Sequence, residues 1–216
     1  DAYAAESVRR AQRASKEGDF VAEIAPVTIK SRKGEQIVAT DETPFQLDID
    51  KIPTLKPAFG KDGTVTAASS SSISDGAAAI VLMSESAARA AGLKPLARLV
   101  SYASHAQAPE WFTTAPAPSM QKALDRAGWK VAEVDLFEIN EAFACVAMAA
   151  MQDLGLRHDQ LNVNGGACAL GHPIGATGAR IITTLLHALR KRGLRRGVAS
   201  QCIGGGEACA VAIELL

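Results

Sequence analysis

The sequence lacks a net charge and any long apolar run, and both features argue against particular classes of partner. Its 216 residues include 23 Lys+Arg and 23 Asp+Glu, so the formal net charge is zero. That balance predicts neither a nucleic acid nor a membrane surface as partner. No stretch reaches the roughly 18 apolar residues of a transmembrane helix, and no signal-peptide pattern is visible. We therefore expect a protein that does not associate with membranes.

Cysteine is also scarce, and its spacing argues against two common uses. None of the four cysteines lies in a C-x-x-C pair; they are Cys145, Cys168, Cys202 and Cys209. Few scattered cysteines in a chain of this length predict free thiols and a cytoplasmic, reducing compartment. Cys168 and His172 are four residues apart, but no second close ligand pair accompanies them. We therefore predict no metal site.

What the sequence does contain is typical of a packed globular protein, with 48% hydrophobic and 21% charged residues. The one basic cluster, residues 191–196, has two interpretations. It can complement the dipole at a helix C-terminus, or it can contribute to binding an anionic ligand. The chain opens at Asp1 in a helical pattern with no starting Met. We therefore expect it to be a piece of a longer polypeptide.

Few regular elements are predicted in the first third of the chain. Asp1 can cap a helix that runs toward Gly18, because apolar and charged residues alternate there with helical spacing. Serine-rich "TVTAASSSSISDGAA" lies between apolar segments, which favours an ordered polar loop over low complexity. The other expectations are a hairpin over 27–40, an extended loop over 41–63, and a strand buried on both faces over 77–83.

Strands and helices alternate along the rest of the chain, which predicts an α/β sheet with helices on its faces. Helices are expected over 85–92, 118–128, 141–155 and 175–193, and strands over 96–104, 134–140, 197–205 and 207–216. A short strand and turn is expected over 160–166. The last two strands read as antiparallel neighbours joined through glycines. Ligand sites in such sheets lie beyond strand ends. Asn140, His172 and Cys202 all fall at such positions.

Cys202 precedes a run of three glycines that begins at Gly204. Glycine lets the backbone approach a ligand closely, and its amides can donate to a developing oxyanion. The alternative is a small buried hydrophobic residue at a strand end, because free cysteine is often only that.

His172 stands on a stiff turn between Gly171 and Pro173, where imidazole can act as a base or an oxyanion donor. The alternative is a surface or capping residue. The other histidines have no such setting, and we expect them to be structural or solvated. Asn140 closes a strand, and it either caps the following helix or points its amide into a cleft.

Three motifs taken together resemble a known family. They are "NEAFA" at 140–144, "NVNGGACALGHPIGATGARI" at 162–181 and "CIGGG" at 202–206. In order and spacing they are similar to the C-terminal half of thiolases, and "LKPAFGKDGTVTA" and "SDGAAAIVLMS" extend the similarity upstream. The resemblance implies an α/β, thiolase-like layered fold, with a mixed sheet covered by helices plus part of the loop domain. It divides the chain into a CoA-binding loop-domain tail (1–73), a segment returning to an N-terminal domain (74–94) and a C-terminal domain (95–216).

The resemblance also implies roles for four catalytic residues. His172 would activate a nucleophilic cysteine and help to stabilise the thioester oxygen. Cys202 would be the acid/base that exchanges a proton with the acetyl-CoA methyl group; a thiol suits this once neighbours lower its pKa from about 8.5. Asn140 would position a water in one oxyanion hole, and the amide of Gly204 would line the other.

The substrates implied by the resemblance are coenzyme A thioesters, with no further cofactor. Ser71 would contact the pantetheine arm, with Ala67 beside it. The reaction would be acyl-CoA plus acetyl-CoA to 3-ketoacyl-CoA plus CoA, reversibly, within fatty acid metabolism. The nucleophile would lie in the N-terminal half, outside this sequence. Cys145, expected in a buried helix, and Cys168 are not replacements for it.

The implied partners are that N-terminal half and further copies, in a homodimer or homotetramer. Two other functions stay open. One is a condensing enzyme like a ketoacyl synthase, against which the Cys202 base argues. The other is a non-catalytic CoA-binding or subunit-interaction fragment.

Overall fold

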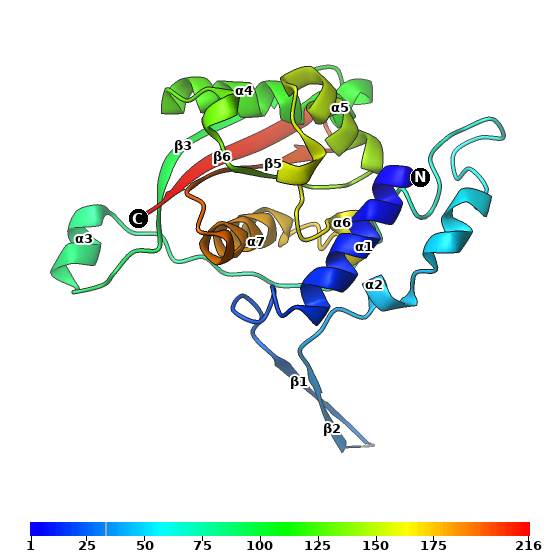
Figure 1. Cartoon of the computed structure of the whole chain (residues 1–216), viewed down its shortest axis with the longest axis horizontal. Helices are drawn as coiled ribbons and strands as arrows, with labels where there is room; N and C mark the ends of the chain where they lie inside the picture. The colour runs from blue at the N-terminus through cyan, green and yellow to red at the C-terminus, as the bar shows by residue number, and fades with distance from the viewer. Residues whose placement is uncertain (33) are drawn as a thin grey trace.

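A four-stranded mixed sheet forms the centre of the molecule in the computed structural model, which describes residues 1–32 and 34–216 (Figure 1). Its strands are β3 (Ala97–Ala106), β4 (Leu136–Ile139), β5 (Arg196–Ile203) and β6 (Glu207–Leu215), in the order β3-β6-β5-β4. β6 runs antiparallel to both β3 and β5, whereas β4 runs parallel to β5. The predicted α/β class, and the antiparallel pairing of the last two strands, are confirmed.

Helices cover both faces of this sheet, with α4 (Pro116–Ala127) and α5 (Ala144–Leu154) on one face and α7 (Thr177–Arg192) on the other (Figure 1). Side chains alternate across β4, so Phe137 packs in the cluster of α4 and α5 while Leu136 packs with α7. Glycines in the left-handed conformation end the helices, as at Gly128 and Gly193. Within the described residues, no helix is long and apolar enough to cross a membrane.

Helix α1 (Ala2–Lys16) lies against the turns that lead to α7, among them the short helix α6 (Ala167–Leu170). Its buried face includes Ala4, Val8 and Ala11, spaced by three or four residues as one helix face requires. The predicted helix is confirmed. Asp1 occupies the N-cap position, but its side chain makes no capping hydrogen bond.

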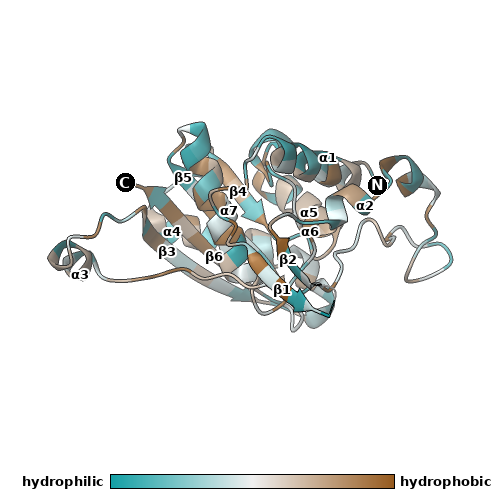
Figure 2. Cartoon of the chain, turned by 90° about the horizontal axis from the view of Figure 1, so that it is seen from below, coloured by the Kyte–Doolittle hydropathy of each residue, from teal (hydrophilic) through white to brown (hydrophobic). Residues whose placement is uncertain are grey.

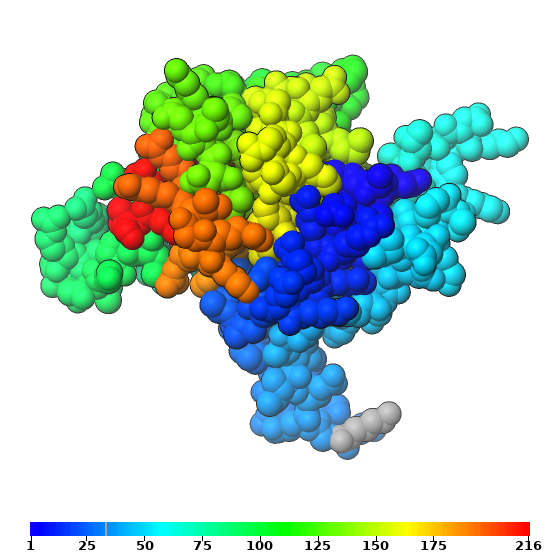
Figure 3. Space-filling view, viewed as in Figure 1, coloured from blue at the N-terminus to red at the C-terminus, as the bar shows by residue number. Residues whose placement is uncertain are grey.

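The predicted hairpin is confirmed as β1 (Val27–Ser31) paired antiparallel with β2 (Gly34–Val38). It stands out from the body of the molecule (Figures 1 and 3). The prediction of an extended loop over 41–63 is wrong in part, because α2 (Thr43–Gln46) and a 3-10 helix (Ile49–Thr54) form there. The Asp48 carboxylate caps the 3-10 helix by accepting from the Asp50 amide.

The prediction of a doubly buried strand over 77–83 is wrong. These residues form no strand, and Val81 and Leu82 are 84% and 71% exposed. A strand needs a neighbour for its backbone hydrogen bonds, and none of the described residues pairs with this segment. Helix α3 (Glu85–Ala90) follows, capped by Ser84 as predicted, at the end of a long extension (Figures 1 and 2).

The prediction of a short strand and turn over 160–166 is wrong for the strand and confirmed for the turn. A 3-10 helix (His158–Gln160) is followed by two isolated bridges, one of which pairs Leu161 with Phe137 of β4. Asn162 has a φ of 47° and Gly165 a φ of 81°, so the backbone turns instead of continuing as a strand.

Helix α5 differs from the prediction at its start, because residues 141–143 are not helical and Phe143 is the N-cap. Asn140 is therefore not a helix cap. Cys145 was expected to be buried, but it lies exposed on the outer side of the first turn of α5. Two more 3-10 helices, Pro109–Thr114 and Val131–Glu133, complete the described elements.

The turn between β5 and β6 generates a stability prediction. Gly206 has a φ of 89°, and a Cβ there would clash with the Gln107 carbonyl oxygen. Gly206→Ala should lower the free energy of unfolding by about 2 kcal/mol or more, because a left-handed non-glycine residue alone costs about 1–3 kcal/mol. Gly204→Ala is the control, since a Cβ at Gly204 meets nothing within 4 Å. Equal losses in chemical denaturation of the two variants would contradict this account.

Candidate active site

Asn140 stands where β4 ends, and the sheet fixes its backbone. Its amide nitrogen donates to the Ser200 carbonyl of β5 at 2.9 Å, which continues the parallel pairing by one residue. The side chain is buried, with its Nδ2 3.4 Å from Nε2 of His172. Its Oδ1 is buried with no hydrogen-bond partner among the described residues. Such an atom commonly accepts from an ordered water or a ligand.

His172 is held on both sides of its ring. Nδ1 lies 2.6 Å from the Thr177 hydroxyl oxygen, which in turn lies 3.0 Å from the Pro173 carbonyl oxygen. The hydroxyl has one proton, which it donates to that carbonyl, so it accepts from Nδ1–H. In the neutral ring Nε2 is then unprotonated and faces Asn140.

The charge state of His172 agrees with this arrangement. Burial, and then the positive charge of Arg180, lower the pKa of His172 below its ordinary value. The ring is therefore neutral near pH 7, with a lone pair on Nε2 that can take a proton.

The serine loop, residues 69–74, connects the two turns that carry Asn140 and His172. At one end the amide and hydroxyl of Ser71 both donate to the Ala142 carbonyl, at 3.0 and 3.1 Å. At the other end the His172 amide donates to the Ser72 carbonyl at 2.8 Å. A Cβ at Gly171 would overlap the Ser74 hydroxyl, so the turn needs a glycine there. The predicted ordered polar loop is confirmed, and it spaces the two turns.

Cys202 lies near the end of β5, two residues beyond Ser200, and is 9% exposed. Burial among apolar side chains raises its pKa to about 11, so the thiol is protonated at neutral pH. The expectation that neighbours lower this pKa is therefore wrong. Its packing partners come from the apolar cluster of α4 and α5, which disfavours the thiolate.

The structure brings together some of the predicted residues and leaves others apart. Asn140 and His172 are within hydrogen-bonding range. Cys202 is at the same edge of the sheet, but within the described residues no hydrogen bond joins it to either. Gly204 is exposed on the turn after β5, and a Cβ built there would meet no atom within 4 Å. Ala67 is exposed two residues before the serine loop.

An open hollow of about 450 Å³ adjoins His172, between residues 74–78 and 173–176. In the part of the chain that the structure describes, no group of three or more His, Cys, Asp or Glu side chains could hold a metal ion.

Sequence reasoning missed two polar residues beside these turns. Thr177 lies five residues after His172, in the first turn of α7, where a hydroxyl can reach back to the preceding turn. Glu141 follows Asn140 and is fully buried. An acidic residue inside an otherwise apolar stretch is the signal that could have found it, because buried carboxylates need partners.

Comparison with known proteins shows the family of the chain. Residues 1–86 match the N-terminal domain of thiolase, and residues 93–215 match its C-terminal domain. The chain belongs to the thiolase family, which confirms the resemblance. The proposed limits of the three segments, at residues 73 and 94, stay predictions.

Named relatives and solved structures agree with this. The chain is 52% identical to a probable acetyl-CoA acetyltransferase of Dictyostelium discoideum and 50% identical to the acetyl-CoA acetyltransferase of Escherichia coli, covering 100% of this chain and 52% and 55% of theirs. Its fold matches an acetyl-CoA acetyltransferase of Bacillus anthracis with a TM-score of 0.97 at 45% identity, over 100% of this chain and 55% of that one. A human mitochondrial 3-ketoacyl-CoA thiolase matches with a TM-score of 0.92 at 41% identity, over the same shares. The chain thus spans about half the length of these relatives, and its thiolase-like layered fold is confirmed.

The ring contacts of His172 generate a spectroscopic prediction. Thr177→Val removes the acceptor for Nδ1–H, so the imidazole should change from one tautomer to a mixture that includes Nε2–H. Side-chain ¹⁵N chemical shifts of His172 measure the tautomer. Thr177→Ser keeps the hydroxyl and should keep the original spectrum. An unchanged spectrum in Thr177→Val would show that Thr177 does not set the tautomer.

The burial of Cys202 generates a second prediction. Its alkylation by iodoacetamide should rise with pH around a midpoint of about 11, because only the thiolate reacts. Free cysteine in the same buffer, with a pKa of about 8.5, is the reference. Peptide mass spectrometry separates Cys202 from the other thiols. A midpoint at or below that of free cysteine would overturn the assignment of a neutral thiol.

Proposed function

We propose that this chain supplies the oxyanion and proton-transfer groups of a thiolase, which converts acyl-CoA plus acetyl-CoA to 3-ketoacyl-CoA plus CoA, reversibly. The observation that carries this is the Asn140–His172 pair, 3.4 Å apart at the end of the sheet in a chain of the thiolase family. The named relatives are acetyl-CoA acetyltransferases. The enzyme is an acetyl-CoA C-acyltransferase whose nucleophilic cysteine lies outside these 216 residues.

His172 acts first in this proposal. Its unprotonated Nε2 takes the proton of the nucleophilic thiol, which then attacks the thioester. The acyl-enzyme forms as the bond from the acyl carbon to the CoA sulfur breaks, and the departing CoA thiolate takes the proton of the Cys202 thiol. The resulting Nε2–H, with a water on the Asn140 amide, donates to the oxygen of the second thioester. Fixed donors at that oxygen stabilise the enolate that forms when the α-carbon loses its proton.

Cys202 exchanges that proton. The exposed amide of Gly204 donates a hydrogen bond to the oxygen of the other thioester, that of the acyl-enzyme. In thiolysis the neutral thiol gives its proton to the α-carbon of the enolate. In condensation the thiol has already given its proton to the departing CoA, and the thiolate that remains takes the proton of the α-carbon. One buried thiol therefore serves both directions.

Coenzyme A thioesters are the substrates, with no resident cofactor. Ser71 already donates its hydroxyl proton to Ala142, so its oxygen is available to accept from an amide N–H of the pantetheine arm. Ala67, exposed two residues before the serine loop, lies beside the arm. A thiolase from Ascaris suum whose structure holds coenzyme A matches this fold with a TM-score of 0.89 at 42% identity, over 100% of this chain and 55% of that one.

The exposed apolar segment over 77–83 is the contact for the rest of the thiolase. Its backbone is extended and unpaired within the described residues, and its large side chains are exposed. Pairing with strands of an N-terminal domain would provide hydrogen-bond partners for the backbone and would bury the apolar side chains. The whole enzyme is a cytoplasmic homodimer or homotetramer of fatty acid metabolism; four free thiols suit a reducing compartment.

Turnover by the complete polypeptide that carries this chain tests the function. It should cleave acetoacetyl-CoA in the presence of CoA, and Cys202→Ser should slow this about 1,000-fold, within the range of general acid–base catalysis. Labelled acetyl-CoA should still acylate the variant, because the nucleophile is another cysteine.

The paired variant Cys209→Ser is the control, since Cys209 is an exposed free thiol on β6 and its loss should leave the rate unchanged. Loss of acylation in Cys202→Ser would mean that Cys202 is structural or is itself the nucleophile. Absence of thiolysis in the unaltered polypeptide would refute the proposed function.

A further inference from the structure

The Glu141 carboxylate, directly after Asn140, is fully buried yet has a hydrogen-bond donor on every side. Oε1 accepts from the Tyr3 hydroxyl at 3.0 Å and from Asn162 Nδ2 at 2.8 Å. Oε2 accepts from the Ser7 hydroxyl at 2.7 Å and from the Cys168 amide at 3.0 Å. Four donors compensate for much of the cost of burying the carboxylate.

These donors come from three separate segments, so the carboxylate is where the segments meet. Tyr3 and Ser7 belong to α1, one turn apart on its buried face. Cys168 lies in α6, four residues before His172. Ser7 also accepts from the Gly166 amide at 2.9 Å, so α1 contacts the start of the His172 turn directly as well as through Glu141. Displacement of the carboxylate would therefore move both the Asn140 turn and the His172 turn.

Asn162 transmits the same constraint to β4. Its Oδ1 accepts from the Ile139 amide at 2.8 Å, and its Nδ2 donates to the Ile139 carbonyl at 2.8 Å. The side chain thus pairs with the strand as a neighbouring strand would, one residue before Asn140. Nδ2 also donates to Glu141, so the carboxylate fixes the position of the Asn162 side chain. Asn162, whose backbone is left-handed, in turn holds the end of β4.

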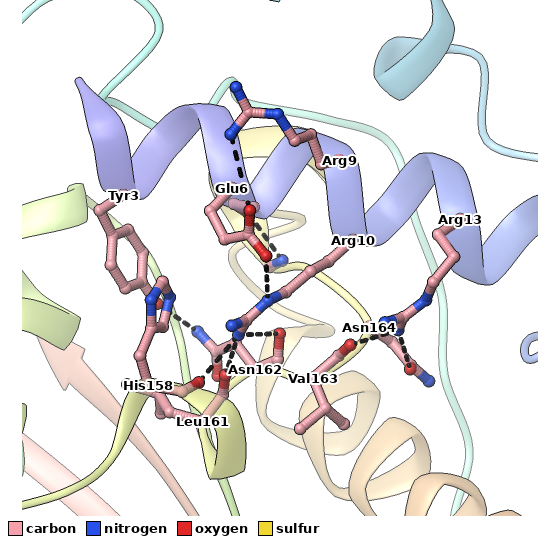
Figure 4. A network of polar contacts seen from close by, with 12 residues as sticks. Tyr3, Glu6, Arg9, Arg10, Arg13, His158, Leu161, Asn162, Val163 and Asn164 are labelled. Atoms are coloured by element: carbon pink, nitrogen blue, oxygen red, sulfur yellow. Dashed lines mark hydrogen bonds and ion pairs between the residues drawn. The ribbon is translucent and has the colours of Figure 1, made fainter.

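Two arginines of α1 donate hydrogen bonds to the backbone of the loop over 158–164, which contains Asn162, as Figure 4 shows. Arg10 Nη1 donates to the carbonyl oxygens of His158 and Leu161, at 3.0 and 2.6 Å. Arg13 Nη2 donates to the Val163 carbonyl at 2.6 Å. The Tyr3 ring stacks on His158 with centroids 5.0 Å apart. Helix α1 and the loop over 158–164 therefore form one supported unit around Glu141.

The backbone packs so closely around Glu141 that only glycine fits beside it. A Cβ at Gly166 would overlap the carboxylate itself, and a Cβ at Gly165 would lie 2.5 Å from the Ser7 carbonyl oxygen. The two glycines of "NGGA" are explained by this approach. A glutamine could not replace the glutamate, because its NH₂ group would face the Cys168 amide or the Asn162 amide, and both are donors.

We propose that Glu141 is a positioning residue. Its carboxylate accepts hydrogen bonds from α1 and, through its other donors, fixes the distance between Asn140 and His172. The effect on catalysis rests on the proposed function, whereas the effect on His172 does not. In this arrangement Tyr3 and Ser7, distant in sequence from both turns, are part of the support of the site.

Two mild substitutions in the complete polypeptide test this, because each removes one donor and keeps the charge. Tyr3→Phe and Ser7→Ala should loosen the Asn140 turn, so Nε2 of His172 loses the Asn140 amide that stabilises its neutral form. The pKa of His172, followed by NMR titration, should rise in both variants. The kcat for acetoacetyl-CoA thiolysis should fall about 10- to 100-fold with KM within twofold, as small displacements of catalytic groups do.

Tyr102→Phe, the same change at an exposed position of β3, is the matched control and should alter none of these quantities. A lowered melting temperature with an unchanged His172 titration and unchanged kcat would show that Glu141 only stabilises the fold, and would overturn the proposal. If the unaltered polypeptide shows no thiolysis, the proposed function fails, and the His172 titration alone decides the role of Glu141.

Discussion

The parallel pairing of β4 with β5 is the interaction on which the rest of the site depends. It continues for one residue beyond β4, where the Asn140 amide donates to Ser200. Both strands therefore deliver their polar residues to the same edge, Asn140 from β4 and Cys202 from β5. Because parallel strands need a crossover connection, α5, the turns after it and α7 link the end of β4 to the start of β5. The His172 turn lies within this connection, just before α7.

Two polar constraints act on that framework. The serine loop ties the Asn140 turn to the His172 turn from outside, through backbone hydrogen bonds to Ala142 and His172. The Glu141 carboxylate ties the same two turns from inside, through the hydroxyls of α1. A buried carboxylate that lost its donors would retain the cost of desolvation, which is strongly destabilising. Hydrogen bonds therefore hold both turns, and the hollow lined by residues 74–78 and 173–176 begins at the residue after His172.

Local signals predicted much of the fold. Glycine stops such as Gly193 and apolar periodicity predicted α4 and α7 nearly to the residue, and the motifs singled out Asn140 and His172, which the structure brings within 3.4 Å of each other. Interactions between distant segments could not be predicted. The segment over 77–83 has strand composition but no partner among the described residues, and Asn162 pairs with β4 through its side chain rather than its backbone. The raised pKa of Cys202 depends likewise on the apolar packing around it, which its motif does not show.

The central claim is that Asn140, His172 and Cys202 surround one reacting thioester. A crystal structure of the complete polypeptide with a non-hydrolysable acetyl-CoA analogue tests this most directly. The account predicts the carbonyl oxygen of the analogue within about 3 Å of His172 Nε2, its α-carbon beside the Cys202 sulfur and a water on the Asn140 amide. An analogue bound with its carbonyl away from all three residues, in a correctly folded and active enzyme, would contradict it.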